Sequence, residues 1–349
     1  MGAKTADDFR IGRGSPCFIA AEIGINHNGD MDLAERMIRE AAMAGVDAVK
    51  FQNYRTEDFI TDRSLRLTYT SNGQVVAEPQ YDLFKRCELR QEDLVRLDRC
   101  CKDNGVVFFS TPTSQETLDA LLELPVPVLK NGSDYLGHLP LIRAMARSGV
   151  CTVLSTGMAT LAEMDAAVQA FHGAGGEALV LLHCTSSYPT PPEEVHLRKI
   201  PALAAAFECP VGFSDHTAGI AAALGAVALG ACMVEKHFTL ARHLPGPDHW
   251  FSATPDEMRT LVGAVRDLEA ALGHSALGPT ACEAAGRVAY RLSCAARTAL
   301  PAGHVLRRED VACLRPGTGL PPAAMDWIVG ARLAGPVAQG HLFTREDLR

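Results

Sequence analysis

The apolar run CFIAAEIGIN at residues 17–26 ends abruptly in polar residues, and seven runs of the same kind follow it along the chain. They are DAVKFQ (47–52), VVFFSTP (106–112), VLKNGS (128–133), CTVLSTG (151–157), ALVLLHC (178–184), PVGFSDH (210–216) and CMVEKHF (232–238). Continuous apolar runs without in–out alternation are typical of parallel strands that are buried on both faces. The pattern therefore predicts eight parallel strands in residues 1–275.

Amphipathic segments lie between these runs. Residues 32–44 and 91–104 repeat apolar side chains at helical spacing, and Gly105 stands where a helix C-cap would. Eight strand–helix units in one stretch of this length match a (β/α)8 TIM barrel of the α/β class. A doubly wound sheet is the alternative, but it usually has fewer strands and a Gly-rich nucleotide loop. The chain contains neither GxGxxG nor GKS/T.

Polar residues stand where these predicted strands end, and a TIM barrel places its functional residues at those ends. We expect these side chains to form one ring: Glu22, Asn26, His27, Lys50, Gln52, Ser110, Thr111, Lys130, Ser133, Ser155, Thr156, His183, Thr185, Ser186, Ser214, Asp215, His216, Glu235, Lys236 and His237. A polar residue can also end a strand because the chain reaches the surface there. That explanation suits single positions better than the whole set.

The ring combines cations with small hydroxyl groups. Lys50 and Lys130 with Thr111, Ser133 and Ser155 are the donors that a phosphate with an attached carboxylate requires. The sequence therefore indicates an anionic metabolite as ligand.

Two histidines and one glutamate suggest further chemistry. His216 and His237 end consecutive strands and could share one metal ion with open positions, although either could instead be a hydrogen-bonded structural residue. Glu22 lies inside an apolar strand, where a carboxylate must be paired, metal-linked or functional. Its structural alternative is a partner for Lys50 or Lys236.

The segment 53–90 interrupts the strand–helix rhythm. Loops of this length are usually functional or lid-like. The sequence suggests no mechanism for it.

The rhythm ends near residue 280, and a short motif then occurs twice, as LPAGHVLRREDV (300–311) and VAQGHLFTREDL (337–348). Each copy predicts a turn followed by a short capped helix, with the acidic pair at the helix N-terminus. Arg315 lies between the copies in a Gly/Pro-rich loop. This loop is either an ordinary surface loop or one that extends into the mouth of a barrel. We expect a barrel at 1–275, a linker at 276–287 and a small domain at 288–349.

Composition restricts the partners. The net charge is -8, from 33 basic and 41 acidic residues, and no basic tract stands out, so we expect no nucleic acid. Residues 217–234 are mostly apolar, but they are rich in Ala and Gly and bounded by charged residues. They predict a buried helix running into a strand, and we expect no membrane association.

The compartment follows from the N-terminus and the cysteines. Residues 1–17 lack the apolar core of a signal peptide, and the eleven cysteines contain no CxxC pair. This usage is typical of reduced thiols in the cytoplasm rather than of a disulfide framework or a zinc site.

The motifs resemble those of a known family. AEIGINHNGD, VKFQ, STP, LSTGM, LLHCTSSYPTP, GFSDHT, EKHFT and GPDH occur in the order found in sialic acid (N-acetylneuraminate) synthases. The C-terminal part looks like their SAF, or antifreeze-like, domain, and Arg315 falls in its RPGxG loop. The resemblance covers essentially the whole chain.

The resemblance implies condensation of phosphoenolpyruvate with an N-acyl amino-sugar aldehyde such as N-acetylmannosamine, giving a nonulosonic acid and phosphate. Phosphoenolpyruvate would be held by Lys50, Gln52, Thr111, Lys130, Ser133, Ser155 and Ser214. A divalent metal, Mn2+ foremost with Mg2+ or Co2+ as alternatives, would sit on His216 and His237. It would polarise the aldehyde and help to deliver water.

The remaining family roles concern protons, the sugar and the second subunit. Glu22 would handle the water proton, with His237 and Arg315 as further catalytic residues. Ser186, Tyr188, Asp248 and Tyr135 match positions on the sugar side. The SAF arginine enters the partner's active site in this family, so Arg315 implies a domain-swapped homodimer.

The departures from the family pattern concern the sugar. Tyr135 stands where an acidic residue is expected, Asn53 replaces Thr or His, and Trp250 and Phe251 replace smaller or basic residues. Leu292 stands where a second basic residue is common. Alternatives are therefore the same chemistry on a legionaminic-, pseudaminic- or specialised-metabolite sugar. Phosphorylated acceptors are less expected, since no spare cationic cluster is visible. A catalytically dead, carbohydrate-binding SAF protein is the non-enzymatic alternative.

Overall fold

The computed structural model describes residues 11–12, 14–71 and 73–349. The chain divides between Gly273 and His274 into two compact units, each described by itself below. This division falls two residues before the expected end of the barrel domain. Part of the N-terminal segment, for which the sequence predicts no signal peptide, lies outside the described residues.

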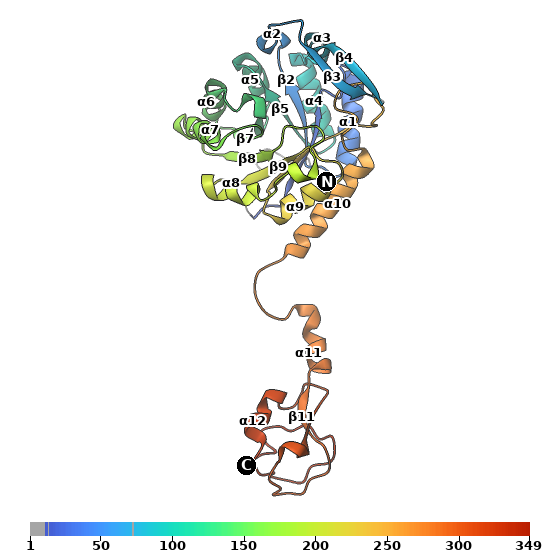
Figure 1. The fold of residues 1–349 in the computed structure, drawn as a ribbon, viewed down its shortest axis with the longest axis vertical. Helices are drawn as coiled ribbons and strands as arrows, with labels where there is room; N and C mark the ends of the chain where they lie inside the picture. Colours follow the sequence, from blue (N-terminus) through green and yellow to red (C-terminus); the bar gives the residue numbers. More distant parts are fainter. Residues whose placement is uncertain (1–10, 13, 72) are drawn as a thin grey trace. The chain divides into compact units, whose positions relative to one another are not determined.

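The first unit is a barrel of eight parallel strands surrounded by helices (Figure 1). Its strands are β1 (Phe18–Gly24), β2 (Ala48–Asn53), β5 (Val107–Pro112), β6 (Val128–Asn131), β7 (Cys151–Ser155), β8 (Leu179–Cys184), β9 (Val211–Asp215) and β10 (Met233–His237). They pair in the order β5-β2-β1-β10-β9-β8-β7-β6, and the ring closes where β5 and β6 meet. Each predicted strand is present, which confirms the barrel.

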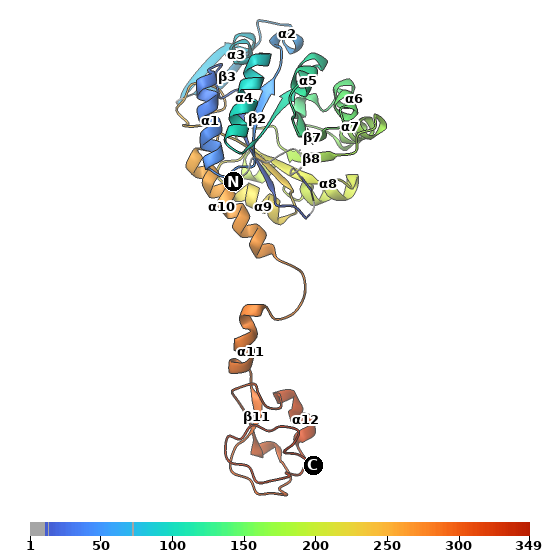
Figure 2. The same ribbon diagram turned by 180° about the vertical axis from the view of Figure 1, so that it is seen from behind.

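Helices cover the outside of the ring. They are α1 (Met31–Met43), α4 (Gln91–Asp103), α5 (Gln115–Leu122), α6 (Leu139–Arg147), α7 (Leu161–Gly173), α8 (Lys199–Phe207), α9 (Ala221–Ala228) and α10 (Pro255–Leu272). The predicted helices at 32–44 and 91–104 are α1 and α4, which lie side by side (Figure 2). Residues 217–234 form α9 and lead into β10, as predicted. Among the described helices, none has both the length and the apolar character needed to cross a membrane.

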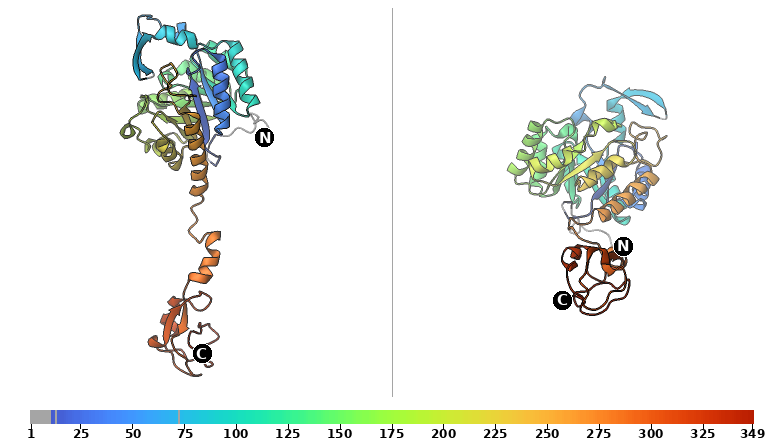
Figure 3. Two further views of the ribbon diagram at one scale, coloured as in Figure 1. Left: turned by 90° about the vertical axis from the view of Figure 1, so that its right-hand side faces the viewer. Right: turned by 60° about the horizontal axis from the view of Figure 1, so that its bottom comes forward.

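The segment 53–90 is folded rather than an open loop. It contains α2 (Thr56–Phe59), an antiparallel hairpin of β3 (Arg66–Ser71) and β4 (Gln74–Pro79), and α3 (Gln80–Cys87). The hairpin stands outside the ring of strands (Figures 1 and 3). Tyr54, Leu83 and Cys87 pack with Ile25 in a small cluster beneath it, which explains why the segment is ordered.

The barrel interior changes from apolar to polar along the strands. Alternate residues of a strand share one face, so Met233, Glu235 and His237 all point inward from β10. Apolar inward residues, such as Ala48, Phe109, Val128, Val153 and Leu182, fill the lower and middle layers. The polar residues that point inward at the strand ends form the top layer.

The ring predicted from the sequence is only partly found there, because Ser110, His183, Asp215 and Lys236 alternate with the inward residues and point away from the interior. Asp215 Oδ2 instead pairs with Lys236 Nζ at 2.7 Å, and His183 bonds the carbonyl of Val195.

The second unit is a small domain built around its own core. It contains η4 (Ala281–Glu283), α11 (Ala284–Tyr290), β11 (Ser293–Ala296), η5 (Arg308–Asp310), β12 (Val311–Leu314), η6 (Pro322–Ala324) and α12 (Met325–Ile328). Cys294, Leu306, Ile328, Leu333 and Phe343 are almost completely buried in it.

The sequence repeat is visible in this unit. Leu300 of the first copy pairs with Val337 of the second, and each Gly-His histidine contacts the aspartate six residues later. His304 Nε2 is 2.8 Å from Asp310 Oδ2, and His341 Nε2 is 3.0 Å from Asp347 Oδ2.

The prediction of a short helix in each copy is only partly right. The first copy forms a single 3-10 turn, η5. The second forms a turn capped by Asp347, and the helix predicted there is wrong, because Leu348 returns at once to extended pairing with Leu333.

Candidate active site

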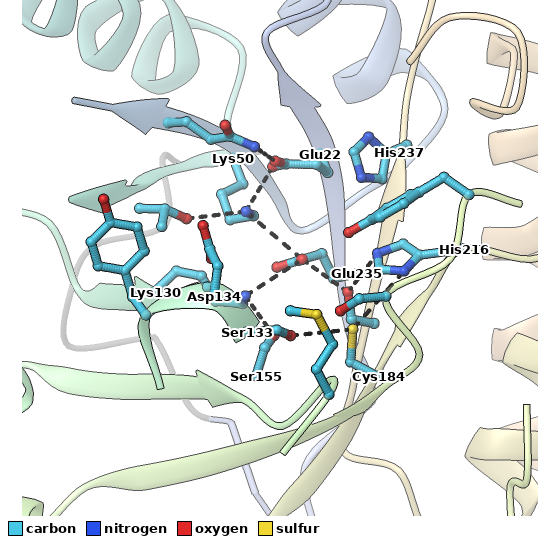
Figure 4. Close-up of a pocket in the computed structure, with 18 of the residues that line it drawn as sticks. Glu22, Lys50, Lys130, Ser133, Asp134, Ser155, Cys184, His216, Glu235 and His237 are labelled. Carbon is cyan, nitrogen blue, oxygen red and sulfur yellow. Dashed lines mark hydrogen bonds and ion pairs between the residues drawn. The ribbon is translucent and has the colours of Figure 1, made fainter. Parts of the chain in front are cut away.

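A cavity of about 410 Å3 opens at the carboxyl ends of the barrel strands (Figure 4). Residues from all eight strands or the loops directly after them line it. They are Glu22, Lys50, Gln52, Thr111, Thr113, Lys130, Gly132, Ser133, Asp134, Tyr135, Ser155, Met158, Cys184, Ser186, Tyr188, Ser214, His216, Glu235 and His237. We call it the active-site cavity.

Four buried charges form one network at the base of this cavity. Lys50 Nζ lies 3.0 Å from Glu22 Oε2 and 3.8 Å from Glu235 Oε1, and Lys130 Nζ lies 3.7 Å from the same Glu235 oxygen. Strand register explains the arrangement, because Glu22 on β1 is directly paired with Lys50 on β2. The structure therefore selects Lys50, rather than Lys236, as the partner of Glu22.

Hydrogen bonds with neutral side chains complete the network. Gln52 donates to Glu22 Oε1 at 3.0 Å and Ser214 donates to Glu235 Oε1 at 3.1 Å. Lys130 donates to Ser155 Oγ at 2.7 Å, and Lys50 donates to Thr111 Oγ1 at 3.2 Å. Figure 4 shows these side chains converging on one space. Two ammonium groups and several hydroxyls thus face a single ligand volume.

Burial sets the protonation of the acids. Burial and the charge of Glu235 raise the pKa of Glu22 to about 7, against the opposing charge of Lys50. For Glu235, burial also acts to raise the pKa, but the charges of Lys130 and Lys50 outweigh it and lower the pKa. Glu235 is therefore the fixed anion of the pair, and Glu22 is able to exchange a proton near neutral pH.

The pKa values of the two lysines are also shifted in opposite directions. Burial acts to lower the pKa of Lys50, but the charges of Glu22 and Glu235 outweigh it, so the pKa is raised. Burial lowers the pKa of Lys130, and Glu235 only partly offsets this. An arriving anion would supply Lys130 with the counter-charge that it lacks.

A tight cradle lies beside Lys130. The backbone N–H of Gly157 donates to Ser133 Oγ at 3.1 Å. A Cβ atom on Gly157 would lie 2.4 Å from Ser186 Oγ and 2.6 Å from Ser133 Oγ, so only glycine leaves both hydroxyls in place. The next residue, Met158, has φ 64°, a backbone conformation that is costly away from functional sites.

His216 and His237 lie together, with ring centroids 5.5 Å apart. Nδ1 of His216 is 2.8 Å from the carbonyl oxygen of Thr185, which fixes the proton on Nδ1 and leaves Nε2 unprotonated near Ser214. Nδ1 of His237 is buried without a hydrogen-bond partner. Both features suit ligation of a metal ion.

Their protonation differs. Burial lowers the pKa of His237 well below its usual value. For His216, burial also acts to lower the pKa, but interactions with Cys184 and the Thr185 carbonyl outweigh it and raise the pKa. In the described part of the chain, no group of three or more His, Cys, Asp or Glu side chains is placed to hold a metal ion. An ion on these histidines would keep other positions open for substrates and water.

The sugar-side predictions fall on one wall. The ring of Tyr188 lies against that of His216, tilted by 37° with centroids 4.2 Å apart, and its centroid is 5.4 Å from that of Phe251. Ser186 and Tyr135 also line the active-site cavity. Asp248 lies just outside it, with Oδ2 3.8 Å from Nδ1 of His237. Of the predicted site residues, Arg315 belongs to the second unit, where its guanidinium lies 5.3 Å from the ring of Tyr290.

Several lining residues had no role in the sequence prediction. Glu235 stood in the predicted polar ring, but nothing in its spacing showed that it neutralises two lysines. Asp134, Cys184, Thr113 and Met158 also lie in the cavity. Cys184 looked like a core cysteine, because it ends a buried apolar strand and scattered cysteines are usually core residues.

The cavity lies at the carboxyl ends of the barrel strands, where a TIM barrel places its functional residues. A model of the NeuB family matches residues 37–276, and a model of the SAF domain matches residues 293–349. The chain therefore belongs to the NeuB family and carries a SAF domain after its barrel.

Named relatives agree with this assignment. The chain is 38% identical over 341 residues to the N,N'-diacetyllegionaminic acid synthase of Legionella pneumophila, covering 97% of this chain and 96% of that protein. It is 34% identical to the human N-acetylneuraminate-9-phosphate synthase, covering 96% and 94%. The N-acetylneuraminic acid synthetase structure from Leptospira borgpetersenii superposes with a TM-score of 0.72 at 36% identity, covering 80% and 93%. The chain is thus a member of a family of sugar-acid synthases.

Proposed function

We propose that the chain condenses phosphoenolpyruvate with the aldehyde of an N-acyl amino sugar, giving a nonulosonic acid and phosphate. The observation that carries this proposal is the pair of buried lysines, Lys50 and Lys130, which share Glu235 opposite two adjacent histidines. Phosphoenolpyruvate has the phosphate and the carboxylate that such a donor set fits. The names of the family members support the same reaction class.

The ligand would be held from two sides. Lys130, Ser155, Ser133 and Gly157 surround the cradle suited to a phosphate, while Lys50 with Gln52 and Thr111 faces the carboxylate side. Binding must displace part of the existing ion pairing, because Lys50 is already paired with Glu22. The bound anion then takes the place of Glu22 as the buried counter-charge of Lys50, which limits the desolvation cost of binding.

His216 and His237 would hold the divalent metal, for which Mn2+ is our first candidate and Mg2+ or Co2+ are alternatives. When bound, such an ion supplies Lewis acidity to the aldehyde oxygen. The wall of Tyr188 and Phe251 keeps this side of the cavity apolar beside the two rings. A carbonyl group placed there is shielded from bulk water.

The chemical steps balance without further cofactors. Carbon 3 of phosphoenolpyruvate forms a bond to the aldehyde carbon, and positive charge develops at carbon 2. Glu22 takes a proton from the water that adds to carbon 2 and passes it to the alkoxide formed from the aldehyde oxygen. The new hydroxyl on carbon 2 then becomes the keto group: the C–O bond to the bridging oxygen breaks, and the hydroxyl proton leaves with the phosphate. Glu235 and Glu22 are anions close enough to stabilise the cationic centre.

A second acceptor class has its own support. A diacetamido-trideoxy hexose, the precursor type of a legionaminic acid, fits the large apolar side chains of Trp250 and Phe251 and the 38% identity to a legionaminic acid synthase. A dead, carbohydrate-binding barrel is disfavoured, because Glu22, Lys50, Lys130, His216 and His237 are all present and converge on one cavity.

We also propose a homodimer in which Arg315 completes the partner's site. Arg315 is exposed beside Tyr290 on the second unit. An exposed guanidinium above an aromatic ring is a suitable anchor for a sugar or carboxylate.

The proposed function is tested by incubating the whole chain with phosphoenolpyruvate, Mn2+ and a panel of unphosphorylated and 6-phosphorylated amino sugars. We expect phosphate release that requires one acceptor, and a product with the mass of that acceptor plus the elements of pyruvic acid. Phosphoenolpyruvate hydrolysis that is indifferent to every acceptor would contradict the proposal.

A further inference from the structure

Asp215 and Lys236 form a buried ion pair behind the two histidines. Oδ2 of Asp215 lies 2.7 Å from Nζ of Lys236, and both side chains are almost fully buried. The two residues alternate with the inward-pointing residues of β9 and β10, so they face the helical layer, where α9 packs on both strands. Neither residue lines the active-site cavity, so the proposed chemistry gives the pair no role.

Thr217 closes this ion pair into a small network. Its N–H and its hydroxyl donate to Oδ1 of Asp215 at 2.8 Å and 2.7 Å, and its carbonyl accepts from Nζ of Lys236 at 2.9 Å. Both oxygens of the carboxylate therefore have partners, and the ammonium group has two acceptors. We call Asp215, Thr217 and Lys236 the clasp.

The members of the clasp are next to the two histidines in the chain. His216 lies between Asp215 and Thr217, and His237 directly follows Lys236. The backbone pairing of β9 with β10 ends at Asp215 and Lys236, so His216 lies beyond the last paired residue of β9. The clasp thus connects the two strand ends at the point where the backbone ladder stops.

The histidine rings themselves have few polar restraints. Nδ1 of His237 is buried without a hydrogen-bond partner, so no hydrogen bond at that atom fixes the ring. His216 is held at Nδ1 by the carbonyl of Thr185, on a different strand end. The separation of the two rings therefore depends on how β9 and β10 are joined. Ligand side chains need placement to within about 0.5 Å for productive geometry.

Stability alone does not explain the clasp. Removing two charges from water offsets most of their mutual attraction, and an apolar pair of similar volume is often equally or more stable. The outward faces of both strands are otherwise apolar, since Val234 and Phe238 flank Lys236 on β10, and Phe213 precedes Asp215 on β9. An apolar pair would suit this layer, whereas an ion pair with fixed hydrogen bonds specifies one geometry.

We propose that Asp215 and Lys236 are positioning residues for metal binding, because they hold the ends of β9 and β10 so that His216 and His237 reach one divalent ion. This inference rests on the proposed function, since it takes the two histidines as the metal ligands. The clasp acts on the affinity for the metal and not on folding or on the binding of phosphoenolpyruvate.

The test compares the whole chain with the double variant Asp215→Leu, Lys236→Met, which removes both charges and leaves neither unpaired. Binding of Mn2+ to the metal-free protein is measured by electron paramagnetic resonance of the free ion, without substrates. We expect the Kd for Mn2+ to rise by about 10- to 100-fold. Without metal, the denaturant midpoint should equal or exceed that of the wild type, and the Kd of phosphoenolpyruvate should be unchanged.

The ion pair of Arg266 with Asp47 provides the matched control. It has the same 2.7 Å separation but lies before the amino end of β2, away from the histidines. The double variant Arg266→Met, Asp47→Asn should therefore bind Mn2+ as the wild type does. A milder variant, Thr217→Val, keeps the ion pair and removes one hydroxyl donor, so it should weaken Mn2+ binding about threefold.

A wild-type affinity for Mn2+ in the double variant would overturn the inference. If the double variant does not fold, Thr217→Val decides, and an unchanged Kd for Mn2+ in that variant would overturn the inference as well. Failure of the proposed function has a different signature. In that case phosphate release would be independent of acceptor, whatever the Mn2+ affinities of the variants.

Discussion

The ammonium nitrogen of Lys50 lies 3.0 Å from Oε2 of Glu22, and both side chains are almost fully buried. This contact links substrate binding to the protonation of the acid. Lys50 lowers the pKa of Glu22, while burial and Glu235 raise it to about 7. An anionic substrate that draws Lys50 away makes Glu22 a stronger base when a base is needed.

The first prediction is an acid limb near pH 7 in the profile of kcat/KM. A carboxyl group whose pKa is raised to about 7 is mostly protonated below that pH and ionised above it. Proton abstraction from water needs the ionised form, so activity should rise as pH increases through 7. In the pH profile of kcat, the same limb should lie at higher pH. Bound substrate engages Lys50, so this lysine no longer lowers the pKa of Glu22. Steady-state phosphate release between pH 5.5 and 9 measures both profiles.

Glu22→Gln provides the control for this profile. The amide cannot take the proton, so kcat should fall by about 10²- to 10⁴-fold while phosphoenolpyruvate still binds. The limb near pH 7 should be absent from the residual activity. A variant that keeps both the limb and the wild-type rate would rule out Glu22 as the base.

A second prediction concerns Lys130, whose ammonium is 2.7 Å from Ser155 Oγ and 3.7 Å from Glu235. Lys130→Met removes a buried cation that faces the substrate, so the Kd of phosphoenolpyruvate should rise at least about 30-fold by calorimetry. Glu235 would then keep only Lys50 as a cationic partner, and the loss of one buried counter-charge should cost about 3 kcal/mol of stability in denaturant unfolding.

Arg266→Met is the matched control for Lys130. Arg266 pairs with Asp47 at 2.7 Å, before the amino end of β2 and so away from the active-site cavity. Its loss should lower stability without changing the Kd of phosphoenolpyruvate. Similar losses of affinity in both variants would indicate a general structural effect rather than binding by Lys130.

The third prediction concerns the metal. His216→Ala or His237→Ala should abolish stoichiometric binding of Mn2+, measured by elemental analysis after dialysis, and should abolish turnover with it. His183→Ala is the control, because His183 is also buried at a strand end but bonds the carbonyl of Val195 outside the active-site cavity. Unchanged metal content in the first two variants would refute the assignment.

The fourth prediction concerns subunit exchange. Arg315→Ala and Glu22→Gln should each be inactive alone. If Arg315 acts on the partner's site, random mixing of the two variants should restore about a quarter of wild-type activity, because half of the dimers then contain one intact site. Mixtures that stay inactive after verified subunit exchange would place Arg315 in its own subunit's site or outside catalysis.

Much of the barrel could be predicted from the sequence, and the reason is local. Each buried parallel strand is a short apolar run that ends in polar residues, and the eight runs appear in the structure as β1, β2 and β5–β10. Strand register then brings the ends together, as for Glu22 with Lys50 and with His237. The ring of functional residues follows from fold class alone.

What the sequence could not show depends on contacts between distant segments. The segment 53–90 packs through Leu83 and Cys87 of α3, and no periodic pattern in the sequence predicts this contact. The role of Glu235 emerges only from its distances to two lysines on other strands. The hairpin also contacts the loop after β10 through a hydrogen bond between Ser71 and Gly246, which are 175 residues apart.

The measurement that tests the central claim most directly is one turnover in H2(18)O with phosphoenolpyruvate, Mn2+ and the acceptor that supports phosphate release. Addition of water to carbon 2 breaks the C–O bond, so the released phosphate should contain no 18O by 31P NMR, and its formation should require the acceptor. Phosphate that carries 18O from water would show attack at phosphorus. The chain would then be a phosphoenolpyruvate hydrolase, and the proposed condensation would be contradicted.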